Sequence, residues 1–394
     1  MRILMVHNDY GRKSGEERAA ESIATLLEHN GHQVDWFRKS SEQLLDSASG
    51  AAKAFFTGIH SPGSRREIET VLDQNQYDLV QVQNLYPLLS PSVLKPIRQR
   101  KIPLVMRCPN YRLFCPNGLH LSDAKVCEKC LGGKEYWCVI KNCERNLPKS
   151  IGYALRTATA RISGAILNNV DVFVVLTEFQ RRRFLDQGIP ANQLAIVPNY
   201  AESPEATGYD SPGELVTYLG RPSQEKGIWE FLEAARSLPE IPFAVAGSKE
   251  ALPEAVASAP PNVDFVGFLS GDDLSRFLQQ TRILVVPSRC FEGFPNTIVQ
   301  AMSYARPVIC SRNGGMPEIV EEGVTGLLYD STSVPELIQQ IRNLYSDIPT
   351  CREMGMAGRE RAGKLFDGKA CYAKLMDAYD LAFRRHGSTQ ACKT

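Results

Sequence analysis

The feature that most constrains the fold of this chain is a repeated alternation of short apolar runs with helical patterns. The first run covers residues 1–6, and a helical stretch follows whose apolar stripe includes Ala19, Ile23 and Leu27 before it stops at Asn30-Gly31. This alternation is typical of βαβ units around a parallel sheet. Later strands of the same sheet are expected at residues 32–37, 78–82, 103–106, 170–176 and 195–197.

A second alternating series follows residues 200–213, a stretch with two prolines and two glycines that is typical of a linker. Its strands are expected at 215–219, 243–246, 263–266, 283–286, 307–310 and 326–329, and its helices at 228–238, 272–280, 296–304 and 334–345. The pattern predicts an α/β protein with two doubly wound domains. Since ligands of such sheets bind beyond the carboxyl ends of the strands, two facing domains would form a cleft between them.

The predicted boundaries follow from these two series. They give an N-terminal domain at 1–198 with a cysteine-rich insertion at 108–143, a linker at 199–213, a C-terminal domain at 214–369 and a final helix within 370–394. That helix is long enough to pack back across the domain boundary. A length of 394 residues agrees with two domains, because a domain usually has about 100–200 residues.

The apolar runs are short throughout the chain. Residues 172–176 and 283–286 are among the longest, far below the roughly 20 residues that cross a bilayer. The apolar core of the first residues is also too short for a signal peptide. We therefore expect a cytoplasmic protein.

The net charge of +1 conceals a basic segment. Residues 95–183 contain 17 Lys and Arg against 6 Asp and Glu, a net of +11, and the rest of the chain has 28 against 38, a net of −10. A local basic patch indicates an anionic surface or ligand, such as lipid phosphate or nucleic acid. A solvated face balanced by acidic neighbours is the alternative.

Three motifs in the second half carry candidate chemistry. The loop Gly220-Arg221-Pro222-Ser223-Gln224-Glu225-Lys226-Gly227 offers backbone N–H groups, a guanidinium and an ammonium to a diphosphate. In Glu292-Gly293-Phe294-Pro295-Asn296-Thr297, glycine permits close approach of a ligand and the next helix points its positive N-terminus at the site. Gly314-Gly315-Met316-Pro317-Glu318 suits a tight turn near a ligand.

In this order and spacing the motifs resemble the C-terminal half of the retaining glycosyltransferases of family 4, which have the GT-B architecture of two facing Rossmann-like domains. The resemblance implies that Arg221 and Lys226 bind the diphosphate of a UDP- or GDP-type sugar and that Glu292 contacts the sugar hydroxyls. It makes Glu292, Arg221 and Lys226 the catalytic candidates. The stretch His7-Asn8-Asp9-Tyr10 through Ser14-Gly15-Glu16 is similar to the family's glycine-containing loop over the donor diphosphate, and Val266-Gly267-Phe268 lies where the family holds the base. Further donor contacts that the resemblance implies are Gly15, Gly267, Phe268, Gly293, Phe294, Pro295, Asn296, Thr297 and Gln300.

Two positions depart from the family pattern. A second glutamate, which binds ribose hydroxyls in the family, is replaced by Gln300, so donor binding should be weaker but not abolished. The histidine that many members place after the strand at 103–106 is also missing. We expect Arg107, Asn110 or Arg112 to orient the acceptor or to meet leaving-group charge there, although packing or capping roles are equally open.

Transfer at such a site needs no strong protein nucleophile, because fixed cations and helix termini stabilise the charge on the departing diphosphate. No Asp-x-Asp pair occurs in the chain. A metal-held diphosphate is therefore not expected, and Arg221 and Lys226 would replace the ion. No cofactor is expected to be required for transfer.

The cysteines need a separate explanation, since six of 11 lie between Cys108 and Cys143. Cys127-x-x-Cys130 is a typical zinc-binding pair, and thiols from the rest of the cluster could complete four ligands. Disulfides and unlinked thiols remain alternatives, and His120 is a further candidate ligand. Some family members are similar in having a cysteine-rich insertion here. The candidate metal ligands are Cys115, Cys127, Cys130, Cys138 and Cys143.

A helix capped by Ser150 is expected after the cluster, with Ile151, Leu155 and Ile162 on one apolar stripe near Lys149 and Arg161. It could pack into the core or rest on an anionic membrane at the inner face.

The favoured function is a retaining glycosyltransferase that acts on a polysaccharide or lipid-linked glycan. A non-catalytic nucleotide-sugar-binding or scaffold protein is the alternative. No nucleic-acid partner is expected, because a nucleic-acid binder would leave the C-terminal motifs unexplained.

Overall fold

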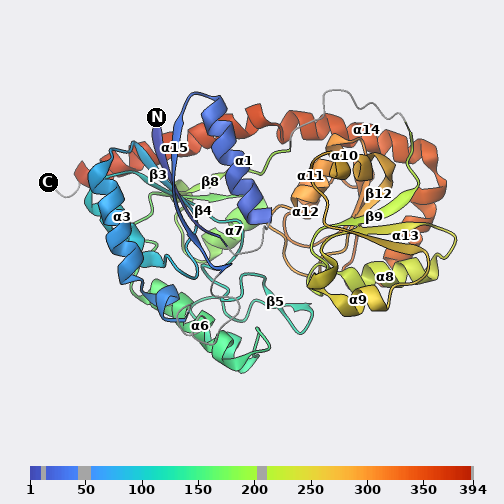
Figure 1. Ribbon diagram of the computed structural model, residues 1–394, viewed down its shortest axis with the longest axis horizontal. Coiled ribbons are helices and arrows are strands. Elements are labelled where there is room, and N and C mark those ends of the chain that lie inside the picture. Colours follow the sequence, from blue (N-terminus) through green and yellow to red (C-terminus); the bar gives the residue numbers. More distant parts are fainter. Residues whose placement is uncertain (10–14, 43–54, 202–210, 392–394) are drawn as a thin grey trace. The chain divides into compact units, whose positions relative to one another are not determined.

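The computed structural model describes residues 1–9, 15–42, 55–201 and 211–391, and the chain divides into two compact α/β units (Figure 1). Unit 1 comprises Met1–His120, Cys127–Val197 and Tyr372–Thr394. Unit 2 comprises Leu121–Val126 and Pro198–Cys371. Each unit contains one six-stranded sheet.

The sheet of unit 1 is wholly parallel, with strand order β2-β1-β3-β4-β7-β8. Its strands are β1 (Arg2–Asp9), β2 (Gln33–Ser40), β3 (Leu79–Asn84), β4 (Leu104–Arg107), β7 (Val172–Val175) and β8 (Leu194–Ile196). Strands β3, β4 and β7 are buried along their whole length, as expected for a sheet that is covered on both faces.

The helices of unit 1 are α1 (Gly15–His29), α3 (Pro62–Gln74), α4 (Leu94–Gln99), α5 (Tyr136–Ile140), α6 (Leu147–Ile162) and α7 (Glu178–Asp186). The apolar pattern predicted α1 but not α3 or α7. Helix α7 buries only Gln180 and Phe184, so it presents almost no apolar stripe. Thr177 caps it by accepting a hydrogen bond from the Gln180 N–H.

The last helix, α15 (Gly368–Ala391), belongs to unit 1 from Tyr372 onward. Tyr379 donates a hydrogen bond of 2.6 Å to Gln81 Oε1 in β3. Asp171, which is almost fully buried, lies 2.6 Å from Arg98 Nη1 and 3.1 Å from His386 Nδ1. These contacts fix the helix against the sheet of unit 1.

Unit 2 has the strand order β11-β10-β9-β12-β13-β14, which is the 3-2-1-4-5-6 order of the doubly wound dinucleotide fold. The strands are β9 (Leu215–Leu219), β10 (Phe243–Ala246), β11 (Val263–Gly267), β12 (Thr281–Val286), β13 (Val308–Ser311) and β14 (Gly326–Tyr329). All strands predicted for the two sheets are present, and each boundary agrees to within three residues.

The helices of unit 2 are α8 (Ile228–Ser237), α9 (Pro253–Ala257), α10 (Gly271–Gln280), α11 (Asn296–Ser303), α12 (Met316–Ile319), α13 (Val334–Ser346) and α14 (Ile348–Leu365). Helices α8 and α9 lie on one side of the sheet, and α10 and α11 lie on the other (Figure 1). The main core includes Phe231, Phe243 and Ile341. A smaller cluster joins Phe277 of α10 to Ala244 and Ala246 on the opposite face.

Helix α6 differs from its prediction in two respects. Its N-cap is Asn146, which accepts a hydrogen bond of 3.0 Å from the Lys149 N–H, and not Ser150. The predicted apolar stripe is also largely exposed, with Leu155 at 46% and Ile162 at 76%. The helix instead buries a face rich in small residues, because Gly152 allows Phe55 to approach so closely that a Cβ atom would lie 2.7 Å from its ring.

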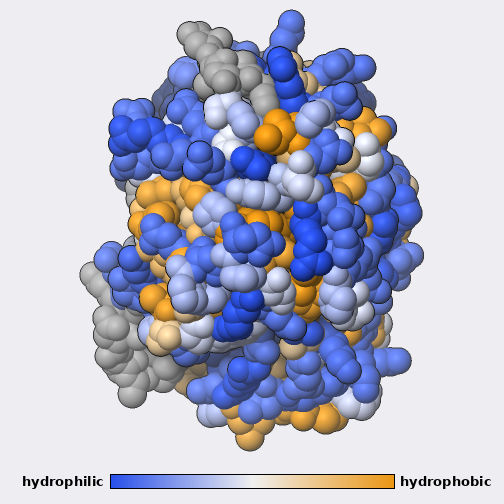
Figure 2. All heavy atoms as spheres, turned by 90° about the vertical axis from the view of Figure 1, so that its right-hand side faces the viewer, coloured by the Kyte–Doolittle hydropathy of each residue, from blue (hydrophilic) through white to orange (hydrophobic). Residues whose placement is uncertain are grey.

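None of the described helices is both long and apolar enough to traverse a bilayer. Figure 2 shows one face of the molecule, on which hydrophilic side chains predominate and hydrophobic ones form small separate patches.

Candidate active site

The candidate donor site of unit 2 lies where the strand order reverses, between β9 and β12. The loop with Arg221 and Lys226 follows β9, and the loop with Glu292 follows β12. Ligands of doubly wound sheets bind at this switch point, beyond the carboxyl ends of the strands. The two principal motifs of the sequence therefore meet at the expected place.

Two glycines allow these loops to pack closely. Gly227 has φ +75°, and a Cβ atom there would lie 1.9 Å from the Pro287 carbonyl oxygen. Gly314 has φ +66°, and its Cβ would lie 2.2 Å from the Glu292 carbonyl oxygen. Gly315 donates its N–H to the same oxygen at 2.7 Å. The paired glycines of the third motif thus hold the Glu292 loop.

Lys226 and Glu292 form an ion pair in this site. Lys226 Nζ lies 2.6 Å from Glu292 Oε1, which also accepts a hydrogen bond of 2.6 Å from Ser288 Oγ. Burial opposes the charge on Lys226, but attraction to Glu292 outweighs it and raises the pKa of Lys226 above its usual value. The lysine stays protonated, and its half-buried ammonium is held at the switch point.

Arg221 is the second cation and is largely exposed. Its Nη2 lies 2.5 Å from Glu225 Oε1. The Tyr218 hydroxyl donates a 2.8 Å hydrogen bond to the Arg221 carbonyl oxygen. Burial, followed by the charges of Glu225 and Glu292, raises the pKa of Tyr218 well above its usual value, whereas Arg221 lowers it. The buried hydroxyl of Tyr218 therefore lies close to charged groups of both loops.

The N-terminus of α11 adjoins Glu292. Pro295 is the N-cap and supplies no side-chain hydrogen bond, and its carbonyl oxygen accepts a hydrogen bond of 3.1 Å from the Ile298 N–H. The N–H groups of the first turn point out of this end of the helix. Phe294 is buried and packs edge-on against Phe366, with ring centroids 5.2 Å apart. The Asn296 side chain accepts a hydrogen bond from Asn199. Gly293 is buried, and Thr297 and Gln300 are partly buried.

The predicted base-binding residues lie at the end of β11. Gly267 has φ +86° and Phe268 is 57% exposed. Gly247, which the sequence analysis did not identify, joins this loop to the first motif. It donates its N–H to the Gly267 carbonyl oxygen at 2.8 Å, and a Cβ on it would lie 2.1 Å from the Gly220 carbonyl oxygen.

In unit 1 the three acceptor-side candidates converge. Arg107, Asn110 and Arg112 line a cavity of about 30 Å³ beyond the ends of β3 and β4. Arg107 is only 2% exposed, and Asn110 Nδ2 donates a 2.8 Å hydrogen bond to Glu16 Oε1 of α1. Gly15 is the exposed first residue of α1. Tyr10 to Ser14, the rest of the predicted donor loop, lie outside the described residues.

Another cluster lies at the same sheet edge, and it includes His7 and Asp9, which the sequence analysis expected in the donor loop but which lie on β1. Ligand atoms of His7, Asp9 and Glu17 all lie within 4.8 Å of one another. Burial, and then Arg38, lowers the pKa of His7, and burial raises that of Asp9. His7 is opposite Asn84 in the β1–β3 pair, at the switch point of this sheet. The pairing thus places a histidine beside Asn84, and this histidine comes from β1 and not from the loop after β4.

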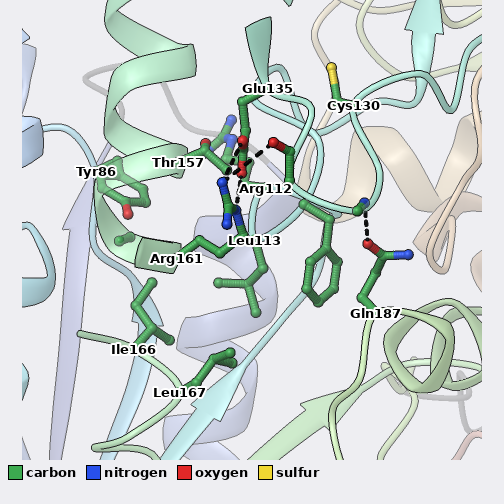
Figure 3. Close-up of a pocket in the computed structure, with 14 residues that line it drawn as sticks. Tyr86, Arg112, Leu113, Cys130, Glu135, Thr157, Arg161, Ile166, Leu167 and Gln187 are labelled. Carbon is green, nitrogen blue, oxygen red and sulfur yellow. Dashed lines mark hydrogen bonds and ion pairs between the residues drawn. The ribbon is translucent and has the colours of Figure 1, made fainter. Parts of the chain in front are cut away.

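A larger pocket of about 220 Å³ adjoins the small cavity and shares Tyr86, Arg112 and Leu113 with it. Figure 3 shows polar groups of Arg112, Glu135 and Arg161 gathered at one end and Ile166 and Leu167 at the other. Arg161 Nε donates a 2.6 Å hydrogen bond to Glu135 Oε1. This mixture of charged and apolar groups suits an amphipathic ligand.

The cysteine-rich segment forms one wall of this pocket through Cys130, Gly132 and Gly133. None of the ten described cysteines forms a disulfide. Burial, followed by the neighbouring Cys115, Cys143 and Cys127, raises the pKa of Cys130 to about 12. His120 is buried, and its Nδ1 lies 3.2 Å from the Cys127 carbonyl oxygen.

Two family models together match most of the chain. The glycosyl transferase 4-like domain matches residues 14–200, and glycosyl transferases group 1 matches residues 199–361. Among solved structures, sucrose-phosphate synthase from Thermosynechococcus elongatus has a TM-score of 0.73 at 19% identity, with 98% of this chain and 99% of that chain covered. Anabaena HepE in complex with UDP and glucose has a TM-score of 0.69 at 17% identity, with 96% and 99% covered.

Curated relatives match over shorter stretches. The sulfoquinovosyl transferase SQD2 of Arabidopsis thaliana is 34% identical over 167 residues, which are 41% of this chain and 32% of that protein. The alpha-D-kanosaminyltransferase of Streptomyces kanamyceticus is 28% identical over 162 residues, covering 39% and 41%. The chain thus spans less than half the length of these two relatives. With two doubly wound units and both family models matched in sequence, the chain belongs to the family-4-type glycosyltransferases of GT-B fold.

Proposed function

We propose that this protein is a retaining glycosyltransferase that moves a sugar from a nucleotide diphosphate donor to a hydroxyl group of a polysaccharide or lipid-linked glycan. The observation that carries the proposal is the Lys226–Glu292 pair, with its 2.6 Å contact, at the switch point of unit 2 beside the N-terminus of α11. This arrangement supplies a fixed cation and the positive N-terminal end of a helix to one anionic ligand.

The residues on each loop have distinct roles in this proposal. Lys226, Arg221 and the first turn of α11 bind the two phosphates and stabilise the charge that develops on them as the glycosidic bond breaks. Glu292 fixes the Lys226 ammonium through Oε1, and its carboxylate accepts hydrogen bonds from hydroxyls of the donor sugar. The leaving phosphate takes the proton of the acceptor hydroxyl, which attacks from the same face. No divalent ion takes part in the transfer.

The donor base is assigned to the loop at the end of β11. The exposed ring of Phe268 offers a stacking surface, and Gly267 and Gly247 link its position to that of Arg221. Gln300, one turn into α11, bonds to the ribose. Complexes of HepE with UDP and with UDP-glucose are among the structures of similar fold, which favours UDP as the first nucleotide to test.

The acceptor is assigned to unit 1. The larger pocket of about 220 Å³ would receive the reacting sugar. Arg107, Asn110 and Arg112 line the adjoining cavity of about 30 Å³, which has room for about one water molecule, and would contact the sugar from that side. His7 and Asp9 orient the acceptor hydroxyl, because the buried ring of His7 lies 3.3 Å from Asp9 Oδ1 at the same sheet edge. Burial lowers the pKa of His7, which keeps its imidazole neutral at pH 7.

Peripheral contact with an anionic membrane at the cytoplasmic face is part of the proposal. Ile140, Leu147, Leu155 and Ile162 on α5 and α6 are all at least 46% exposed. They lie in the basic segment of net charge +11, which has 17 basic and 6 acidic residues. Apolar side chains beside basic ones are typical of helices that rest in a lipid interface. Such contact would bring a lipid-linked acceptor to the enzyme.

A non-catalytic nucleotide-sugar-binding protein is the second candidate, and Gln300 in place of a carboxylate favours it. A thermal-shift screen with UDP, GDP, ADP and their sugars would first identify the nucleotide, since a ligand that binds the folded state raises its stability. Incubation with the matching sugars then separates the two functions. Transfer or slow donor hydrolysis supports the enzyme, whereas binding with neither reaction for any glycan acceptor supports the second candidate.

The decisive variant is Lys226→Met, which keeps the length of the side chain but removes its charge. We expect kcat/KM to fall by roughly 10²–10³-fold, because a fixed group that stabilises leaving-group charge is lost. Arg312→Met is the control, since Arg312 is exposed and forms an ion pair with Glu322, which is also exposed. Unchanged turnover and donor affinity in Lys226→Met would contradict the proposal.

A further inference from the structure

The cysteine-rich segment has little regular structure to hold it in place. Between Cys108 and Cys143 the regular elements are the hairpin of β5 (Leu121–Ser122) and β6 (Lys125–Val126) and the short helix α5. Four non-glycine residues in this stretch have positive φ: His120, Asp123, Ala124 and Asn142. Such conformations cost roughly 1–3 kcal/mol each and persist only where the surroundings impose them. Something other than a large apolar core must therefore impose this conformation.

The structure brings the thiols of this segment together. Cys130 interacts electrostatically with Cys115, Cys127 and Cys143, and Cys115 interacts with Cys143. Cys130, Cys138 and Cys143 also pack in one cluster with Ala154. Residues that are as many as 28 positions apart in sequence, from Cys115 to Cys143, thus surround Cys130.

The hairpin joins the first two thiols. His120 and Cys127 flank the Leu121–Val126 pair, and Cys127 donates its N–H to the His120 carbonyl oxygen at 2.7 Å. The backbone N–H groups of His120, Gly118 and Asn117 are directed at Cys115 Sγ. Burial nevertheless raises the pKa of Cys115 to about 11, and its thiol donates a hydrogen bond of 2.9 Å to Asn117 Oδ1. Binding of a metal ion at Cys115 would release this proton.

We propose that this segment holds one structural zinc ion through the thiolates of Cys115, Cys127, Cys130 and Cys143. Zinc takes four thiolates in a tetrahedron, and Cys127-x-x-Cys130 supplies two adjacent corners. The two remaining corners come from Cys115, on the far side of the hairpin, and Cys143, beyond α5. The ion links both sides of a segment that lacks a core of its own.

Cys138 is the fifth thiol and lies behind the ligands. It is 1% exposed, packs against Ala154 and forms a side-chain hydrogen bond with Cys143. A thiol that donates to a metal-bound sulfur orients that ligand. Cys127 and Cys143 are partly exposed, so a metal ion can reach the site from solvent.

The sulfurs are more widely spaced than in a metal-bound site. Among the described residues, the one group of three potential ligands whose atoms all lie within 4.8 Å is His7, Asp9 and Glu17. Zinc–sulfur bonds of about 2.3 Å would draw the four thiolates closer together.

The ion would also shape the larger pocket of unit 1. Cys130, Gly132, Gly133 and Arg112 line this pocket, and Arg161 Nη2 donates a hydrogen bond of 3.4 Å to the Gly133 carbonyl oxygen. Zinc therefore fixes one wall of the pocket. The statement that this wall contacts the acceptor rests on the proposed function. The proposal of a metal site does not depend on that function.

The first test is elemental analysis of the full-length chain purified without added metal. We expect about one zinc per chain. Cys115→Ser and Cys130→Ser should retain about one tenth or less of that content, since each removes a ligand. Cys108→Ser is the matched control, because Cys108 is equally buried just upstream and its Sγ contacts the Met106 carbonyl oxygen at 3.7 Å; it should keep its zinc. Absence of zinc from the wild type, or full zinc in Cys130→Ser, would overturn the site.

Two further measurements keep the test independent of whether a variant folds. Cobalt(II) added to the wild-type chain after removal of zinc should give the visible absorption of a tetrahedral thiolate site, and its absence would overturn the proposal. Intact-mass analysis that found disulfides among these thiols would do the same. Zinc lost from Cys138→Ser but kept in Cys127→Ser would overturn the assigned ligand set. None of these readouts depends on sugar transfer, so the function and the metal site can fail separately.

Discussion

Single residues at the donor site are defined by the charges around them. Lys226 keeps its proton in a partly buried position because Glu292 lies 2.6 Å away, and Glu292 is in turn held by Ser288 and by the Gly315 N–H. Gln300 is the position where charge is missing, since a carboxylate stands there in the family that the motifs resemble. A neutral amide makes weaker hydrogen bonds to hydroxyls than a carboxylate does.

We expect Gln300→Glu to retain donor affinity or to improve it by up to about 1 kcal/mol, roughly fivefold in Kd, because a charged acceptor bonds more strongly to the ribose. Isothermal titration calorimetry with the nucleotide chosen by thermal shift measures the change. Gln339→Glu is the control, since Gln339 is exposed on α13 and bonds to Asn343. A collapse of binding in Gln300→Glu alone would contradict the ribose assignment.

The loop after β13 approaches the Glu292 loop closely at Gly314, and this contact fixes the position of the Glu292 backbone. Gly314→Ala should destabilise unit 2 by roughly 2–4 kcal/mol, because it combines positive φ with a clash against the Glu292 backbone. Gly323→Ala separates the two effects, since Gly323 has φ +75° but no atom within 4 Å of its Cβ position. Urea denaturation should show the smaller loss, about 1 kcal/mol, for Gly323→Ala. Equal losses would mean that the loop contact contributes nothing.

Helix α6 presents its larger apolar side chains to solvent and its small residues to unit 1. We expect Leu155→Ser combined with Ile162→Ser to weaken binding to vesicles that contain anionic lipid by about tenfold or more, since each exposed side chain would otherwise bury apolar area in the interface. Vesicle co-sedimentation measures the effect. Val324→Ser with Met356→Ser is the control pair, because both residues are about as exposed as Leu155 but lie in unit 2. Equal binding of both double variants and the wild type would rule out α6 as the contact.

For the molecule as a whole, the last helix completes the N-terminal unit. Tyr379 is 1% exposed and bonds to Gln81 in β3, although 298 residues separate them. Tyr379→Ala should therefore destabilise unit 1 by about 3–5 kcal/mol, the usual cost of deleting a buried aromatic side chain. Tyr372→Ala, at the edge of the same helix and only partly buried, should cost less. Amide hydrogen exchange of β3 measures both, and an unchanged β3 in Tyr379→Ala would contradict this role.

Much of this fold follows from local pattern. The apolar runs predicted every strand of both sheets, because the pattern that distinguishes a buried strand from an amphipathic helix extends over only a few neighbouring residues. The same pattern missed α3, α7 and α14, whose buried faces contain few large apolar side chains. It also missed the short helices α4, α5, α9 and α12. It also left open whether the apolar stripe of α6 faces the core or a membrane, since the partner of a helix cannot be predicted from the helix alone.

The loop motifs and the chemistry that they suggest could likewise be predicted from the sequence. Which of these side chains lie together in the structure could not. His7 lies opposite Asn84 because β1 pairs with β3, and Asn84 lines one cavity with Arg107 because β3 pairs with β4. Gly314 supports Glu292 only because β12 and β13 are adjacent. Strand order is set by packing between segments that are far apart in the chain. Short-range periodicity therefore specifies which elements form, whereas contacts over long separations specify which side chains share a site.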